Sequence, residues 1–159
     1  MKHQTKVNRT SERELVVSRI IGGPSGKVFE AWSNPEHFKK WWVPRSAPIT
    51  LVSCEMNVCT GGTYRLKFSA GPQTMEFFGK YIEVSPCSRL VWTNEESGGN
   101  APVITTVTFQ EIDGMTLVTV HDLYPSKKAL DDAIASESTG ALPEQLEQLE
   151  QHIKELKSS

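Results

Sequence analysis

His121 and Asp122 are adjacent near the end of a predicted strand, where they could take part in acid–base chemistry. A histidine beside a carboxylate can act as a general base because its pKa lies near neutral pH. Such a reaction needs a second titratable group in the same site, for which Glu55 or Glu95 is the candidate. A single histidine on a strand is more often an ordinary hydrogen-bonded residue, so the pattern favours a non-catalytic His121.

The remaining reactive side chains form no catalytic or metal-binding motif. The sequence contains no Gly-x-Ser-x-Gly motif of a serine hydrolase and no glycine-rich phosphate loop. Cys54 and Cys59 lack a second Cys or His pair nearby, which leaves too few ligands for a zinc site. Arg19, Arg45 and Arg65 could supply polar groups to a pocket, although surface charges or rim salt bridges are the favoured interpretation. We therefore expect no catalytic residues, no metal and no cofactor.

Composition and charge exclude several classes of protein. The 159 residues carry a formal net charge of −2 and the pI is about 6.1, which provides no basic surface for nucleic acid. No apolar run approaches the ~20 residues that a membrane helix needs, so we expect no membrane insertion. An odd count of three cysteines argues against a disulfide framework, and the polar N-terminus lacks a signal peptide. These features predict a cytoplasmic protein.

The segment from Asn34 to Pro44, NPEHFKKWWVP, concentrates aromatic residues on a predicted short helix. Trp41 and Trp42 are adjacent, and consecutive side chains on a helix diverge by about 100°, so the two cannot point in one direction. In one interpretation, one Trp packs inward while the other faces the mouth of a ligand cavity. In the other interpretation, which we favour, both Trp side chains close the end of the core.

The pattern of apolar residues predicts an α+β domain whose strands are joined by hairpins. Asp113-Gly114 predicts a tight hairpin turn because both residues accept a positive φ. Near the C-terminus, apolar residues recur every three or four positions, which predicts a long helix that packs one stripe on the sheet. The stripe consists of Leu142, Leu146, Leu149, Ile153 and Leu156. The predicted strands span residues 14–21, 49–54, 63–69, 74–84, 89–94, 103–112 and 115–122, and two short helices span residues 26–33 and 35–42.

Four segments carry a family resemblance: KVFEAWSNPEHFKKWWVP from Lys27, the pair Gly61-Gly62, GKYIEVSPCSRLVWT from Gly79, and GMTLVTVHD from Gly114. They resemble the START-like superfamily, also called the SRPBCC or birch-pollen-allergen fold. Within it, they resemble the family named for the activator of the Hsp90 ATPase. The resemblance implies a helix-grip fold, in which a curved antiparallel sheet of six or seven strands wraps the C-terminal helix. It covers residues 13–157 as a single domain and leaves residues 1–12 as a flexible tail.

The resemblance implies a function as well as a fold. It implies a cytosolic protein that binds a small hydrophobic or aromatic ligand, lipids included, in an internal cavity, with a role in stress response. A cyclase- or hydrolase-type enzyme that uses the same cavity is an alternative, and a homodimer is left open. A role as co-regulator of an Hsp90-type chaperone is a further alternative, but no chaperone partner is expected because residues 1–12 are too short for a separate binding domain.

The candidate site residues follow from the same comparison. Many members of the family carry a large aromatic residue after the glycine that opens the last helix, where this chain has Ala141 after Gly140. This difference either enlarges the cavity mouth or marks a subgroup. The predicted ligand-binding residues are Trp41, Trp42, Phe78, Trp92 and His121.

Overall fold

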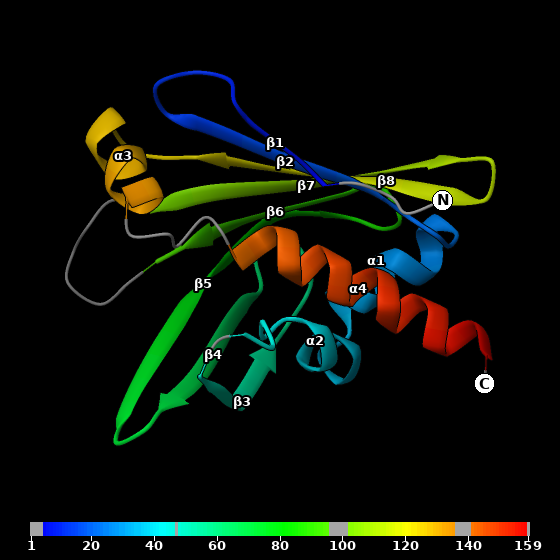
Figure 1. The fold of residues 1–159 in the computed structure, drawn as a ribbon, viewed down its shortest axis with the longest axis horizontal. Helices are drawn as coiled ribbons and strands as arrows, with labels where there is room; N and C mark the ends of the chain where they lie inside the picture. The colour runs from blue at the N-terminus through cyan, green and yellow to red at the C-terminus, as the bar shows by residue number, and fades with distance from the viewer. Residues whose placement is uncertain (1–4, 47, 96–101, 136–140, 159) are drawn as a thin grey trace.

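The computed structural model describes residues 5–46, 48–95, 102–135 and 141–158. In this part of the chain, one antiparallel sheet in the strand order β1-β2-β8-β7-β6-β5-β4-β3 curves past the C-terminal helix α4 (Figure 1). The strands are β1 (Lys6–Arg9), β2 (Glu14–Ile21), β3 (Thr50–Met56), β4 (Thr63–Ala70), β5 (Gln73–Ser85), β6 (Arg89–Asn94), β7 (Val103–Ile112) and β8 (Met115–Leu123). The helices are α1 (Ser25–Ser33), α2 (Pro35–Trp41), α3 (Lys127–Ala135) and α4 (Ala141–Ser158).

The predicted α+β helix-grip architecture is confirmed, with a correction to the number of strands. All the predicted strands are present within a few residues of their predicted ends. The count of six or seven was too low, because the described sheet has 8 strands. The additional strand is β1, which lies in the segment predicted as a tail and pairs with β2 at the edge of the sheet. All its residues are exposed, so no alternation of apolar and polar residues marks it in the sequence.

The apolar stripe of α4 is buried against the sheet, as the sequence predicts. Leu146, Leu149 and Ile153 are fully buried, and Leu142 and Leu156 pack partly buried beside them. We call the side of the sheet that packs on α4 the helix-facing side, and the opposite side the outer side. Adjacent residues on each strand point alternately to these two sides.

Helices α1 and α2 close one end of this core with a cluster of aromatic rings. Trp41 is fully buried and its Nε1 donates a hydrogen bond to the carbonyl of Ala31 at 2.9 Å. Trp42 is half-buried and stacks on Phe38 with the ring centroids 4.7 Å apart. Trp32 makes T-shaped contacts with both rings, and its ring centroid lies 4.8 Å from that of Trp41 and 6.0 Å from that of Trp42. The adjacent tryptophans therefore pack on different sides of one cluster, and Trp41 is the inward one.

Side chains of α4 cap the C-terminal end of α2. Gln148 Nε2 donates to the carbonyls of Trp41 and Val43 at 2.9 and 2.8 Å, and its Oε1 accepts from the Arg45 amide at 2.8 Å. Gln145 Nε2 donates to the carbonyl of Trp42 at 2.6 Å. The last carbonyls of a helix have no partner within the helix. These two glutamines supply the partners and hold α2 against α4.

A pair of histidines makes a second polar link between these helices. His37 Nδ1 and His152 Nε2 lie 3.1 Å apart, and His37 Nε2 lies 3.3 Å from a carboxylate oxygen of Glu30. Burial lowers the pKa of His152, and the neighbouring His37 and Lys40 lower it further. The folded protein therefore keeps His152 neutral at a pH where the unfolded chain protonates its histidines, near ~6.5.

This pair predicts a loss of stability in acid. Because the unfolded chain binds the proton more readily than folded His152 does, this contribution is complete above about pH 6.5 and falls as the pH drops toward the folded pKa. We expect the melting temperature to fall between about pH 7 and 5, and to fall less in His152→Gln, whose side chain does not titrate. Thermal unfolding followed by circular dichroism measures both profiles. Parallel profiles for the two proteins would contradict the prediction.

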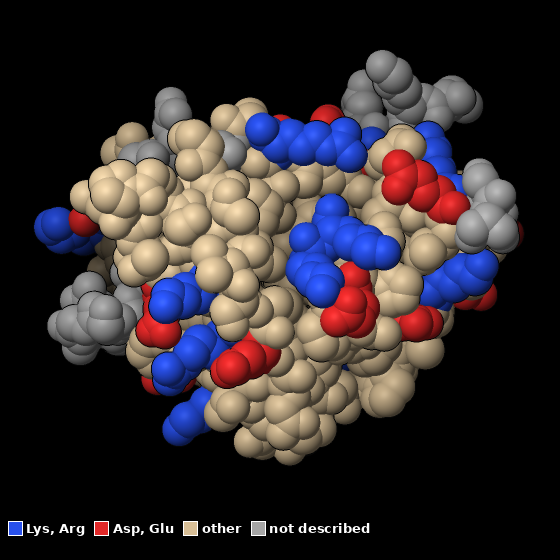
Figure 2. Space-filling model, turned by 90° about the horizontal axis from the view of Figure 1, so that it is seen from below, with Lys and Arg blue, Asp and Glu red and all other residues tan. Residues whose placement is uncertain are grey.

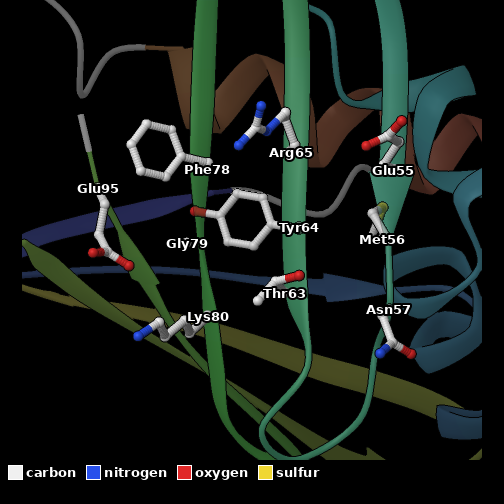
Figure 3. Close-up of a pocket in the computed structure, with 10 residues that line it drawn as sticks. All are labelled: Glu55, Met56, Asn57, Thr63, Tyr64, Arg65, Phe78, Gly79, Lys80 and Glu95. Carbon is white, nitrogen blue, oxygen red and sulfur yellow. The ribbon is translucent and has the colours of Figure 1, made fainter. Parts of the chain in front are cut away.

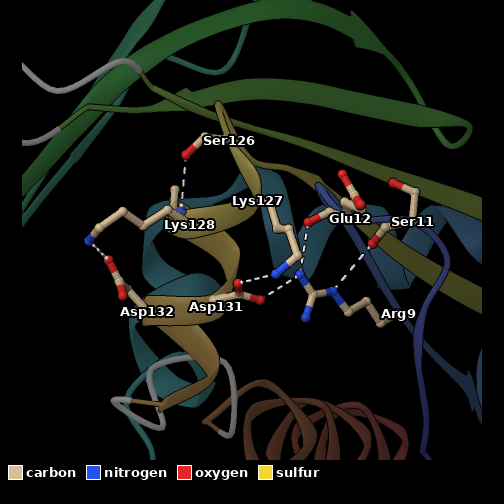
Figure 4. A network of polar contacts seen from close by, with 9 residues as sticks. Arg9, Ser11, Glu12, Ser126, Lys127, Lys128, Asp131 and Asp132 are labelled. Atoms are coloured by element: carbon tan, nitrogen blue, oxygen red, sulfur yellow. Dashed lines mark hydrogen bonds and ion pairs between the residues drawn. The ribbon is translucent and has the colours of Figure 1, made fainter.

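Helix α3 lies beside the end of the sheet at which β8 reaches Leu123, and ion pairs hold the helix in this position (Figure 1). Arg9 of β1 pairs with Asp131 at 2.7 Å and donates to the carbonyl of Glu12 at 2.9 Å (Figure 4). Lys127 pairs with the other oxygen of Asp131 at 2.8 Å. Leu130 is the fully buried residue of the helix. The helix is thus tied to the turn between β1 and β2 by Arg9.

Candidate functional site

The structure divides the predicted ligand-binding residues between the two sides of the sheet. Trp41, Trp42 and Trp92 belong to the aromatic core on the helix-facing side. Phe78 and His121 point to the outer side, since the residues next to them on β5 and β8 face the core. The five residues therefore do not form one site.

His121 makes a different contact from the one that the sequence analysis considered. Its Nε2 lies 2.9 Å from a carboxylate oxygen of Glu14 on the neighbouring strand β2. The described contacts of His121 include neither Glu55, which lies on β3 at the far edge of the sheet, nor Glu95, which follows β6 and pairs with Phe78. His121 is thus hydrogen-bonded to the neighbouring strand.

A chain of hydrogen-bonded polar side chains crosses the helix-facing side of the sheet. The hydroxyl of Tyr64 on β4 lies 3.2 Å from Asn94 Oδ1 on β6. Asn94 Nδ2 donates to Thr105 Oγ1 on β7 at 2.7 Å, and Thr105 donates to Asp122 Oδ1 on β8 at 2.6 Å. We call Tyr64, Asn94, Thr105 and Asp122 the polar chain. It joins the four strands β4, β6, β7 and β8.

Aromatic side chains border the polar chain. Tyr81, Trp92, Thr105 and Asp122 are successive cross-strand partners on four neighbouring strands, so they form one row on the helix-facing side. Trp92 Nε1 donates to Asn94 Oδ1 at 3.3 Å. The row therefore passes from two aromatic residues to a hydroxyl and a carboxyl.

The indole of Trp32 has an unused donor in the same cluster. Among the described residues, its Nε1 is the buried side-chain nitrogen or oxygen that lacks a hydrogen-bond partner. The ring centroid of Trp32 lies 5.8 Å from that of Trp92. Buried indole N–H groups usually have a hydrogen-bond acceptor, so Trp32 leaves an unsatisfied donor in this part of the core.

The carboxyl of Asp122 belongs to a half-buried side chain. Burial raises the pKa of Asp122, which outweighs the hydrogen bond from Thr105 and the adjacent His121, both of which lower it. Nearby, burial and the charge of Asp122 raise the pKa of Tyr124 to about 12. The hydroxyl of Tyr124 therefore stays protonated near neutral pH.

Gly79 makes the start of the polar chain possible. Tyr64 pairs with Gly79 in register, and the tyrosine ring crosses over it to reach β6, where its hydroxyl donates to the carbonyl of Thr93 at 2.7 Å. A Cβ atom on Gly79 would lie 2.9 Å from Tyr64 Cε1. The absence of a side chain at this position therefore lets the aromatic ring pass across β5.

The outer side of β3, β4 and β5 carries a groove of about 570 Å³ (Figure 3). Glu55, Arg65, Phe78 and Glu95 are cross-strand partners that form one row along it. The Arg65 guanidinium lies 5.9 Å from the ring centroid of Phe78 and 3.7 Å from Glu76. Phe78 thus lines an open groove with charges of both signs, and the sequence analysis had placed it in an internal cavity.

The surface charges are mixed. On the face shown in Figure 2, lysine and arginine side chains lie beside aspartate and glutamate side chains and form no continuous basic area. No helix in the described ranges is both long enough and apolar enough to cross a membrane.

The polar chain was not predicted, although polar residues at core-facing strand positions indicate it in the sequence. Thr105 alternates with Val107 and Phe109 on β7, so it occupies a position of the buried row where an apolar residue is expected. Asn94 and Asp122 interrupt the buried rows of β6 and β8 in the same way. A polar residue at a core-facing strand position marks either a buried hydrogen-bond network or a binding site.

Ala141 is the first residue of α4. The predicted effect of Ala141 on the cavity mouth depends on its position after Gly140, which lies outside the described residues.

Residues 23–154 match the model of the family described as Activator of Hsp90 ATPase homolog 1-like protein. No curated protein matches the chain. A solved structure from Rhodobacter sphaeroides has a TM-score of 0.87 at 18% identity and covers 96% of this chain and 99% of its own. A structure from Nitrosomonas europaea has a TM-score of 0.83 at 20% identity and covers 95% of this chain and 100% of its own. An AHSA1-like protein from Aeromonas hydrophila has a TM-score of 0.70 at 16% identity and covers 91% of this chain and 95% of its own. At these identities the likeness establishes the fold.

Proposed function

The chain belongs to the family of Activator of Hsp90 ATPase homolog 1-like proteins, and from this premise we propose that it binds a small apolar or aromatic ligand on the helix-facing side of its sheet. The observation that carries the proposal is the polar chain beside Trp92 and Tyr81. Ligand sites are mostly apolar and contain a few placed polar groups that orient the ligand. The helix-facing side offers this combination.

A second observation supports the same location. A core that only stabilises the fold has little use for polar groups, because each one costs free energy unless it is fully paired. Here Asp122 is half-buried at the end of the polar chain with a raised pKa, and Trp32 Nε1 has no acceptor within the described part of the chain. A bound ligand would supply hydrogen-bond partners to these two groups.

The proposal includes a cytoplasmic location. Cys54, Cys59 and Cys87 are free thiols, which is the usual state in a reducing compartment. A lipid as the ligand and a role in stress response stay predictions from the family resemblance.

Binding of pyrene, a neutral polyaromatic probe, tests the proposal. We expect one molecule of pyrene to bind per chain and to quench tryptophan fluorescence. Trp92→Leu removes the aromatic ring beside the polar chain and is expected to weaken binding by about tenfold or more. Phe78→Leu is the matched control, since it makes the same change on the outer side and should leave the affinity unchanged.

Each outcome of this titration bears on the proposal. Absence of uptake by the unmodified protein would overturn it. Equal losses in Trp92→Leu and Phe78→Leu would also overturn it, because the probe would then not distinguish the two sides of the sheet. Native mass spectrometry of protein purified from its source is an independent check, and we expect it to show a bound small molecule.

A further inference from the structure

From Asn94 to Asp122, the hydrogen bonds of the polar chain run in one direction and end on an acceptor. Tyr64 has one donor proton, which it gives to the carbonyl of Thr93 at 2.7 Å. Asn94 uses its amide group toward Thr105 at 2.7 Å, and Thr105 uses its single hydroxyl proton toward Asp122 at 2.6 Å. Both of these bonds between side chains, Asn94 to Thr105 and Thr105 to Asp122, therefore donate toward β8. The last member, Asp122, accepts this hydrogen bond at Oδ1, and no side chain in the described part of the protein donates to its Oδ2.

The donor that Asp122 lacks is not supplied by a nearby cationic side chain. Within the described ranges, no Lys or Arg forms an ion pair with it. Arg13, from the adjacent end of β2, directs its Nε to the carbonyl of Tyr124 at 2.9 Å. The neighbouring His121 points to the outer side, where it contacts Glu14 at 2.9 Å. Burial of even part of a carboxylate without a cation costs free energy, and a cation brought by a ligand would offset that cost.

The row of cross-strand partners defines the distance between the acidic end and the aromatic end. Trp92 and Asp122 lie on β6 and β8 with Thr105 of β7 between them. Two strand spacings separate them by about 10 Å at the backbone. The Trp92 ring offers apolar contact area, and such a ring also attracts a cation that approaches its face. A ligand that spans the row needs an aromatic group joined to a donor by a short flexible linker.

We infer that the ligand of this protein is an arylalkylamine whose protonated amine binds the carboxylate of Asp122 while its aromatic group packs on Trp92. This inference rests on the proposed function and specifies the chemical class of the ligand. Thr105 and Asn94 act as positioning residues, because they fix the orientation of the carboxyl through the polar chain.

Two isosteric probes, 2-(1-naphthyl)ethylamine and 1-propylnaphthalene, test the inference. They share the aromatic group and the chain length and differ in the terminal ammonium. We expect the unmodified protein to bind the amine at least about tenfold more tightly than the hydrocarbon, as measured by tryptophan quenching. Asp122→Asn keeps the shape and the acceptor for Thr105, and it should remove the preference while leaving hydrocarbon affinity unchanged. Glu14→Gln, the matched change on the outer side, should keep the preference.

The outcomes separate this inference from the proposed function. Uptake of both probes with equal affinity, or tighter binding of the hydrocarbon, would overturn the amine inference and leave the proposed function standing. Uptake of neither probe would overturn both. If Asp122→Asn does not fold, the pH dependence of the unmodified protein replaces it. Preference for the amine should then fall as acid protonates Asp122, and a preference independent of pH would contradict the inference.

Discussion

Gly79→Ala is expected to destabilise the protein by at least about 3 kcal/mol, because no adjustment of a flexible side chain can make room for the added methyl group. A Cβ atom on Gly79 would lie 1.8 Å from the carbonyl oxygen of Thr93 and 2.9 Å from the ring of Tyr64. The oxygen belongs to the backbone of β6, so it can move only if the pairing of β5 with β6 is disturbed. Urea denaturation followed by circular dichroism measures the free energy of unfolding.

Gly26→Ala provides the matched control for this substitution. Gly26 lies in α1, where an added Cβ would meet Cys87 Sγ at 3.9 Å, an ordinary contact distance. Alanine is the better helix former, so this variant should be stabilised by about 0.5–1 kcal/mol. If Gly79→Ala were as stable as Gly26→Ala, the close approach of β5 to β6 would be wrong.

The same glycine connects the shape of the sheet to the candidate site. Because Gly79 has no side chain, Tyr64 can cross β5 and begin the polar chain on β6. A larger residue would therefore disturb both the packing of the strands and the hydrogen bonds that lead to Asp122. Stability and ligand affinity should fall together in this variant, whereas Asp122→Asn should separate them.

Much of the fold could be predicted because its signals are local. Asp113 and Gly114 adopt φ values of 51° and 80°, as expected of the tight hairpin between β7 and β8. The spacing of apolar residues in α4 identified a buried stripe in the same way. Strand β1 was missed because its four exposed residues carry no such pattern, and its pairing with β2 becomes visible only in the folded sheet.

The candidate site was harder to predict because its contacts depend on register between distant strands. His121 and Glu14 are 107 positions apart, so no local pattern could show that they meet. The sequence placed His121 and Asp122 together, but alternation sends them to opposite sides of the sheet. The sequence analysis considered His121 for chemistry, and the structure puts Asp122 on the side that packs against α4. Such a choice requires knowing which strand face is buried.

Arg19 is the clearest case in which a charge expected at the surface is buried. It alternates with Val17 and Ile21 on β2, so it points to the helix-facing side. Its guanidinium contacts Glu150 Oε1 of α4 at 2.7 and 3.2 Å, and it also donates to Thr5 at 3.0 Å. The exposed fractions of the two charged side chains are 9% and 8%. The pair therefore links the sheet to α4 inside the protein.

Glu150→Ala is accordingly expected to lower the free energy of unfolding by about 3–5 kcal/mol, because it leaves the buried charge of Arg19 without its partner. Glu147→Ala, an exposed position on the same helix, should change stability by less than about 0.5 kcal/mol. The double variant Arg19→Met with Glu150→Leu should recover most of the loss, since apolar residues can fill the same space without desolvating a charge. Urea denaturation of the three variants distinguishes a charge effect from a packing effect. Failure of the double variant to recover stability would show that α4 depends on the hydrogen-bond geometry of the pair, beyond the neutralisation of Arg19.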